Sequence, residues 1–248
     1  MYNKHQQEFT NDEPVDFKGL LIYPVKVKDY FKFMMFHSIL CIDKNSISDA
    51  KIISMSYLDF LIYLMTESEE SKQNCTYCFY ELMKLCTRNN DIKIYTGHDE
   101  NNKSIIQIND IVFNKKDFNE LKDIIIYQNM PNYKDEYINP ELKEELEEKE
   151  RLENKNTHSV SIEKQIASIV IGSSLTFEDV LNLTLRKFYI ILEMIDKKLN
   201  YQIYKTASMS GMVEFKTEIQ HYLTESDVSE LEGEVINMDD LSSKLSKG

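Results

Sequence analysis

The stretch Thr176–Leu223, TFEDVLNLTLRKFYIILEMIDKKLNYQIYKTASMSGMVEFKTEIQHYL, decides the organisation of the chain. Its apolar residues recur in steps of four and three, at Leu181, Leu185, Phe188, Leu192, Ile195 and Leu199. This spacing predicts one helix of about six turns with a single apolar face. Thr176 suits the N-cap, and Asp179 stands at the capping-box position three residues later. We therefore predict a helix that begins at Thr176 and packs this face into the core.

The segment that follows, from Tyr201 to Met212, combines residues that are favoured at protein interfaces. Tyr offers an apolar body with a polar tip, and Met adapts its shape to a partner. The predicted partner-binding residues are Tyr201, Tyr204, Lys205, Ser208, Met209 and Met212. An alternative interpretation puts both tyrosines in the core and uses Gly211 to end a helix. The two interpretations are compatible, because a core on one face leaves the other face free.

The N-terminal half reads as a mixture of helices and short strands. Residues 1–13 are polar, and we expect them to form a flexible arm. We predict that residues 14–130 form an α+β domain. Pro24 interrupts the strand-like Phe17–Val27, which favours an edge strand or two short strands. A hairpin is predicted from Ile92–Tyr95 and Ile105–Val112. Helices are predicted at Tyr30–Leu40, Asp49–Thr66, Asn74–Thr87 and Lys116–Asn129.

The C-terminal half is predicted to be helical. Residues 131–160 form a linker with a charged helix at Glu141–Asn156, a pattern typical of a solvated connecting helix. Residues 161–224 are predicted to form a helical domain, whose first helix is Ser161–Ile171. Residues 225–248 are predicted to form an acidic tail. The fold class is therefore α+β and predominantly helical: a small N-terminal antiparallel sheet with packed helices, a charged connecting helix and a C-terminal helical domain.

Composition narrows the function classes. The chain has 248 residues, 6 Gly and 4 Pro, which favours helices over turn-rich all-β folds. Its net charge of −13 repels phosphate backbones, so we expect no nucleic-acid partner. The sequence shows neither a signal peptide nor a long apolar run, so we expect no membrane partner and a cytosolic location where the chain is made.

Four cysteines raise the question of a metal site. Cys75 and Cys78 have CxxC spacing, and Cys86 and His98 are the nearest further candidates for a tetrahedral zinc site. The second half of a zinc motif is missing, however. The simpler interpretation is that the three cysteines of the helix Asn74–Thr87 pack as small apolar residues.

No catalytic signature stands out in the sequence. The chain contains no GxGxxG, Walker A, HExxH or GxSxG motif. The five histidines are scattered singly, and the carboxylates gather in the charged helix and the tail. We therefore expect a protein that is not an enzyme and has no cofactor.

Three stretches resemble proteins from the tail gene clusters of bacteriophages that infect Gram-positive bacteria. They are LRKFYIILEMIDKKLNYQIYKTASMSG (185–211), FKGLLIYPVKVKDYF (17–31), and YQNMP with DEYINPEL (127–131 and 135–142). Members of this family are described as tail or baseplate-hub assembly proteins, or tail assembly chaperones. The resemblance implies a non-enzymatic assembly protein of the host cytoplasm, and it brings no catalytic residues with it.

The resemblance also implies the partners, which would be other tail proteins such as the hub, tube or tape-measure protein. We expect binding through the helical region Ile162–Leu223. Two alternatives stay open: a structural subunit retained in the tail of the virion, and a zinc-stabilised regulatory protein that uses Cys75 and Cys78.

Overall fold

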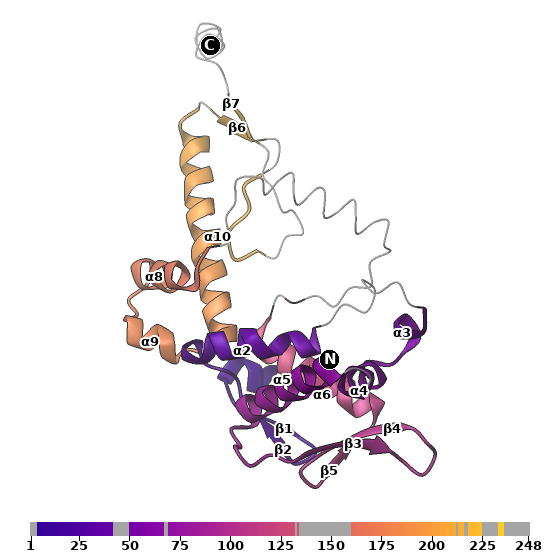
Figure 1. Cartoon of the computed structure of the whole chain (residues 1–248). Helices are drawn as coiled ribbons and strands as arrows, with labels where there is room; N and C mark the ends of the chain where they lie inside the picture. Colours follow the sequence, from indigo (N-terminus) through magenta and orange to yellow (C-terminus); the bar gives the residue numbers. More distant parts are fainter. Residues whose placement is uncertain are drawn as a thin grey trace, which may run out of the picture.

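The computed structural model describes residues 4–41, 50–66, 69–131, 133, 160–211, 213–215, 218–224 and 233–235. It confirms the α+β, predominantly helical class. The five described strands between Val15 and Phe113 lie at one end, the helices between Tyr57 and Asn129 lie against them, and the long helix Leu185–Met209 rises away from this body (Figure 1). The predicted charged helix Glu141–Asn156 lies outside the described residues, and so does most of the predicted tail. None of the described helices combines the length and the hydropathy that a membrane span requires.

The N-terminus differs from the predicted flexible arm. Residues Gln6–Asn11 form helix α1, and Phe9 on this helix is buried in the main hydrophobic core. The guanidinium of Arg186 lies 5.6 Å from the centre of the Phe9 ring. The prediction was wrong here because one buried aromatic side chain is enough to hold a single polar turn of helix, and no periodic pattern announces it.

The first two strands form a tight hairpin. Strand β1 (Val15–Phe17) pairs antiparallel with β2 (Leu20–Ile22), and the alternate residues of both strands are buried. Lys18 and Gly19 have positive φ angles of 57° and 86°, which is typical of a two-residue hairpin turn. Of the two alternatives predicted for Phe17–Val27, the structure therefore has the edge strand: β2 belongs to a two-stranded sheet, and the described residues after Pro24, up to Asp29, form a 3-10 turn and no second strand.

The next segment is helical. It contains the 3-10 turn η1 (Val27–Asp29), helix α2 (Tyr30–Phe36), the 3-10 turn η2 (His37–Leu40), and helices α3 (Ala50–Ser54), α4 (Tyr57–Thr66) and α5 (Glu69–Thr87). A single helix was predicted for Asp49–Thr66, but the described residues 50–66 form two helices, α3 and α4. The break occurs because the Ser56 hydroxyl accepts a hydrogen bond from the amide of Asp59 at 3.2 Å and so begins a new helix.

A three-stranded antiparallel sheet follows, in the order β3 (Ile94–His98), β4 (Ser104–Ile108) and β5 (Ile111–Phe113). The predicted hairpin is confirmed, although its second half is two strands joined at Asn109, which has a φ of 54°. Helix α6 (Lys115–Asn129) then begins with a complete capping box between Asn114 and Asp117.

Aromatic contacts join these elements into one core. Phe118 on α6 lies 6.0 Å from Phe79 on α5 and 6.5 Å from Tyr57 on α4, measured between ring centres. Phe17 and Phe113 stack at 5.9 Å and connect the hairpin with the three-stranded sheet. All of these rings are at least nine-tenths buried, so the two sheets and the three helices share one apolar interior.

The C-terminal elements are α8 (Ile162–Gly172), α9 (Phe177–Asn182), α10 (Leu185–Met209), β6 (Val213–Phe215) and β7 (Gly233–Val235). The predicted start at Thr176 is confirmed, since Thr176 and Asp179 form a capping box. The single continuous helix was wrong, because the chain is extended at Leu183 and restarts at Thr184. The carbonyl of Leu183 accepts from the amide of Val27 at 2.9 Å, and the amide of Leu185 donates to Val25 at 2.8 Å. These bonds to the N-terminal half interrupt the helix.

Asp59 gives the body a dependence on pH. Burial opposes its ionisation, but hydrogen bonds from Lys115, Ser104 and Ser56 outweigh burial and lower the pKa from 3.8 to about 2. Because the folded pKa lies below the unfolded one, this carboxylate stabilises the fold above about pH 4, and the contribution is lost as the pH falls from about 4 to about 2.

We expect Asp59→Asn to lower the unfolding free energy at pH 7 by about 1 kcal/mol, allowing for solvent screening. The difference from the wild type should shrink as the pH falls from about 4 and be smallest near pH 2, as urea unfolding would show. Glu163→Gln, at an exposed position of α8, is the control. An equal deficit of Asp59→Asn at both pH values would contradict this account.

Candidate protein-binding surface on the long C-terminal helix

The first turn of α10 is fixed to the body by polar contacts. The Thr184 hydroxyl donates to Oδ1 of Asp12 at 2.9 Å and accepts from the amide of Lys187. The Lys187 ammonium lies 2.9 Å from Oδ2 of Asp12, and the Arg186 guanidinium donates to the carbonyl of Tyr127 at 2.7 Å. Contacts to α1 and α6 therefore set the direction in which the helix leaves the body.

Burial decreases along the apolar stripe of α10, which we define as Phe188, Leu192, Ile195, Leu199 and Ile203. Phe188 is fully buried, Leu192 and Ile195 are half-buried, and Leu199 and Ile203 are 52% and 61% exposed. The five positions fall within about 80° of one another around a helix of 3.6 residues per turn. One continuous apolar face thus runs from the core of the protein to its surface.

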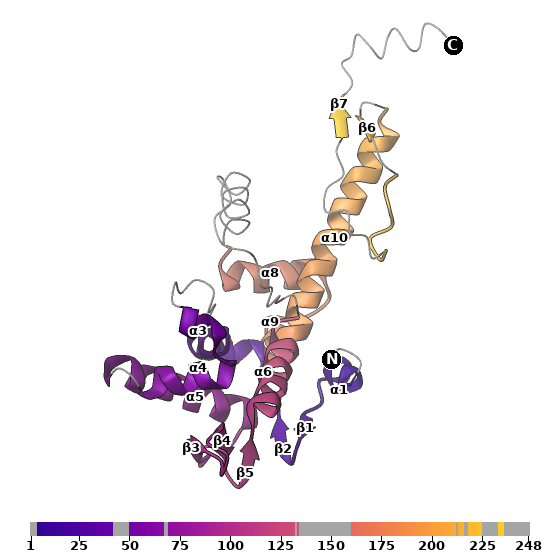
Figure 2. The same ribbon diagram turned by 90° about the vertical axis from the view of Figure 1, so that its right-hand side faces the viewer.

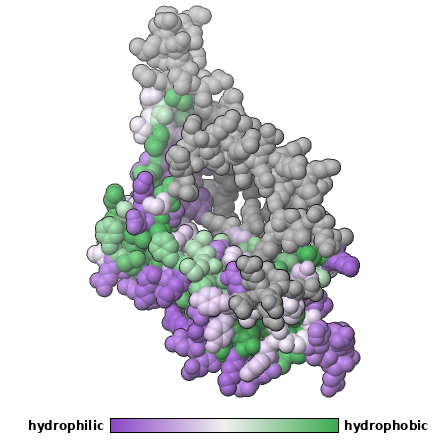
Figure 3. Space-filling model, viewed as in Figure 1, coloured by the Kyte–Doolittle hydropathy of each residue, from purple (hydrophilic) through white to green (hydrophobic). Residues whose placement is uncertain are grey.

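The position of helix α8 explains where the apolar stripe of α10 stops being buried. The last residue of α8, Gly172, is so close to α10 that a Cβ there would lie 3.0 Å from Cδ1 of Ile195. Helix α8 crosses α10 and does not run alongside it (Figures 1 and 2), so it covers the stripe only near Ile195. Figure 3 shows hydrophobic residues over α8 and α9 and along α10. The sequence-based prediction of a buried face was right from Leu185 to Ile195 and wrong at its two ends, because Leu181 and Leu199 are 38% and 52% exposed.

A second segment covers a different side of α10. Beyond Gly211, whose φ of 69° ends the helix, residues 213–215 and 218–223 run back along it, and we call them the return segment (Figure 2). The ring of Tyr204 lies 5.7 Å from that of Phe215. The ring of Tyr201 lies 5.2 Å from His221 and 5.9 Å from Tyr222. The tyrosines stand about 140–200° around the helix from Leu199, so the return segment leaves the apolar stripe open.

The structure thus separates the six residues predicted to bind a partner. Tyr201 and Tyr204 are half-buried and pack within the chain, while Lys205, Ser208 and Met209 are exposed. Met212 lies outside the described residues. Partner binding by this set stays a prediction. Sequence reasoning missed Ile203, although its position four residues after Leu199 continues the same face.

We expect Tyr204→Ala to loosen the return segment without unfolding the body. An aromatic pair of this kind contributes about 0.5–1.5 kcal/mol, so the amides of Val213 and Phe215 should exchange with solvent about 2- to 10-fold faster. Hydrogen exchange followed by mass spectrometry would measure this. Ser208→Ala, an exposed change on the same helix face, should leave the rates as they are. If these amides exchange in Tyr204→Ala at the same rates as in the wild type, the contact of Tyr204 with Phe215 does not hold the return segment.

The four candidate zinc ligands do not assemble into a site. Cys75 and Cys78 are half-buried on α5, Cys86 is fully buried, and His98 is exposed on β3. Burial raises the pKa of Cys86 to about 12, and burial, then Cys78, raises that of Cys75. Both shifts favour the protonated thiol, which is a poor metal ligand. Across the described ranges, no group of three His, Cys, Asp or Glu could hold a metal ion. Metal analysis of protein purified without added metal tests the zinc alternative.

Among the described residues, each of the three carboxylates with a lowered pKa occupies the same kind of position, in the first turn of a helix. Asp59, Asp117 and Asp179 each stand three residues after the residue that caps a helix. Hydrogen bonds from Thr176 lower the pKa of Asp179, and bonds from Lys18 and Asn114 outweigh burial at Asp117. A lysine makes the largest lowering contribution at Asp59 and at Asp117, and the capping residue Thr176 does so at Asp179. The three groups lie at the starts of three different helices. The expectation that the protein is not an enzyme stays a prediction.

Comparison with protein families relates part of the chain to a known domain. Residues 153–227 match the YomV second domain. This is a domain of a phage-type protein family, so the match connects the chain with phage proteins. The matched YomV-like range contains α8, α9, α10 and the return segment, which together carry the candidate surface. Neither the curated proteins nor the solved structures include a match to this chain.

Proposed function

We propose that this protein is a non-enzymatic phage tail or baseplate-hub assembly protein, a tail assembly chaperone, that acts in the host cytoplasm. The observation that carries the proposal is the match of residues 153–227 to a domain of a phage-type family. The resemblance of three stretches to proteins of phage tail gene clusters supplies the specific role, and one of them, 185–211, lies inside the matched range.

The geometry supports a protein-binding role for the matched region. Helix α10 is fixed at its base and presents Leu199 and Ile203 at its outer half. An apolar face that begins in the core and emerges on a projecting helix is suited to packing against a groove or a helix of another protein. The predicted residues Lys205, Ser208 and Met209 lie around the same outer half and would contribute to the rim.

The proposed partners are other tail proteins: the hub, tube or tape-measure protein. The net charge of −13 disfavours a nucleic-acid partner, and we propose no membrane partner. Purified full-length protein should bind at least one of these three proteins from its own phage in a pull-down assay. If the protein binds none of the three, the proposal is wrong.

A structural subunit retained in the virion is the alternative. The same apolar stripe would suit a permanent contact, since permanent interfaces are larger and more apolar than transient ones. Mass spectrometry of purified virions separates the two. Stoichiometric amounts in the particle would identify a subunit, and absence from it would identify a factor that leaves before assembly ends.

A further inference from the structure

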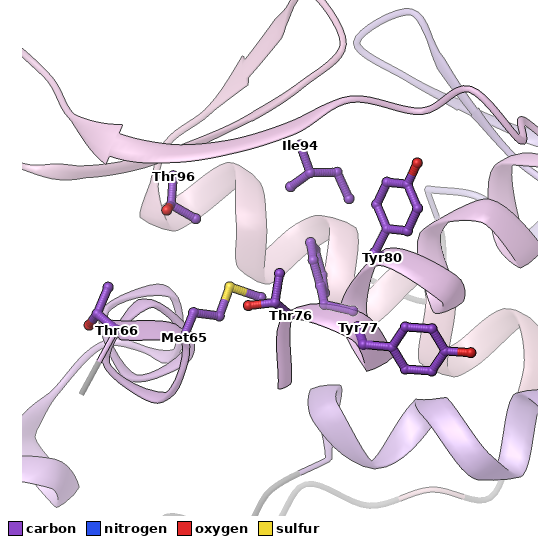
Figure 4. Close-up of a pocket in the computed structure, with 8 residues that line it drawn as sticks. Met65, Thr66, Thr76, Tyr77, Tyr80, Ile94 and Thr96 are labelled. Carbon is purple, nitrogen blue, oxygen red and sulfur yellow. The ribbon is translucent and has the colours of Figure 1, made fainter. Parts of the chain in front are cut away.

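A cavity of about 620 Å³ lies beside strand β3, far in the chain from the α10 surface. Figure 4 shows that the C-terminal end of α4 and the middle of α5 form one side of it and β3 the other. Eight residues line it: Met65, Thr66, Thr76, Tyr77, Phe79, Tyr80, Ile94 and Thr96. None of them is charged, although the chain as a whole carries a net charge of −13. Its volume is in the range of protein binding pockets.

The cavity has a buried floor and an accessible mouth. Met65 and Phe79 are 6% and 1% exposed, whereas Tyr77 is 56% exposed. The Tyr77 ring also packs edge-on against Phe36 of α2 at 5.8 Å, which holds it as a wall of the cavity. Such a site accepts an uncharged apolar group, because a charge placed against this floor would lose its hydration without gaining a partner.

Strand β3 presents an open edge at this cavity. The sheet order β3-β4-β5 makes β3 an edge strand. The amide of Asn109 donates to the carbonyl of Lys93, and the amide of Asp99 donates to that of Lys103. In an antiparallel pair the hydrogen-bonded residues alternate, so the odd-numbered residues of β3 face β4 and Ile94, Thr96 and His98 direct their backbone groups outward. Among the described residues, no hydrogen bond reaches these outward groups.

The edge also lacks the usual protection against pairing. Natural edge strands carry charged residues, proline or bulges that discourage the addition of another strand. Residues Ile94–His98, IYTGH, contain neither proline nor Asp, Glu, Lys or Arg. The side chains of Ile94 and Thr96 point into the cavity, so the open backbone and the apolar cavity form one continuous site (Figure 4).

We propose that an extended segment of a partner protein adds to β3 as a fourth strand and inserts an uncharged apolar side chain into the cavity. The outward amides and carbonyls of Ile94, Thr96 and His98 provide the backbone hydrogen bonds. The cavity selects the side chain, since every second residue of the added strand faces it. The site is independent of the α10 surface and of the proposed function.

A random nine-residue peptide library displayed on yeast tests the proposal. The full-length protein is the bait, and Thr96→Arg, which places a charged side chain at the cavity mouth, is the counter-bait. We expect enriched peptides with apolar residues at alternate positions, whose affinity falls at least 10-fold for Thr96→Arg. Tyr95→Arg, on the opposite face of the same strand and 59% exposed, should bind them within 2-fold of the wild type.

Backbone exchange distinguishes strand addition from binding in the cavity alone. A bound peptide should slow the exchange of the Ile94, Thr96 and His98 amides at least 10-fold, as measured by NMR on the wild-type chain. Circular dichroism checks that the variants are folded, and Thr96→Pro, which removes one outward N–H, replaces Thr96→Arg if that variant is not. The proposal is overturned if no peptide discriminates against the variant, or if bound peptides leave these three amides unprotected.

Discussion

Phe188→Ala should lower the free energy of unfolding by about 3–5 kcal/mol, the largest stability effect that we expect of a single side chain in the C-terminal half. Phe188 is 0% exposed and belongs to the same core cluster as Phe118 and Phe113. Removing its ring leaves a cavity between α10 and the body. The polar contacts of Arg186 and Lys187 cannot close this cavity, because they fix the backbone around it.

Urea unfolding followed by circular dichroism would measure this change. Phe31→Ala is the matched control, since Phe31 is 71% exposed on α2 and its loss should change the free energy by less than about 0.5 kcal/mol. A deficit below about 1 kcal/mol for Phe188→Ala would mean that the base of α10 is not part of the cooperative core.

The double variant Leu199→Glu/Ile203→Glu should lose binding to its tail-protein partner by about 100-fold or more, while its unfolding midpoint stays within about 2 °C of the wild type. Burying each of these side chains at an interface is worth about 1.5–3 kcal/mol, and a carboxylate in their place adds a desolvation cost. The fold should be unaffected because both residues are more than half exposed.

Biolayer interferometry against whichever of the hub, tube or tape-measure proteins binds the wild type would measure the loss. Ile190→Glu is the control, because Ile190 is 40% exposed and lies about 180° around the helix from Leu199. If the double variant binds as tightly as the wild type, the apolar stripe is not the interface, although the assembly role would survive.

Much of the local structure was predictable from residues close in sequence. Thr176 with Asp179 marked the start of α9, and the helix predicted at Asn74–Thr87 corresponds to most of α5. These features depend on capping and periodicity, which act within one or two turns. The candidate surface was only partly predictable: the outer half of α10 was indicated, but Ile203 was not.

The sequence by itself determined the fold class, most helices and the hairpin of β3 with β4, because each follows from neighbouring side chains, whereas the hairpin of β1 with β2 was not predicted. Only the tertiary structure decided that the apolar face from Leu181 to Leu199 belongs to two helices. Backbone hydrogen bonds of Val25 and Val27 with Leu185 and Leu183 interrupt the helix between them. The tertiary structure also decided which half of α10 is buried, because α8 ends at Gly172 beside Ile195. The physical reason is that a periodic apolar face shows that a helix can pack, whereas the length and position of its neighbours decide how much of that face is covered.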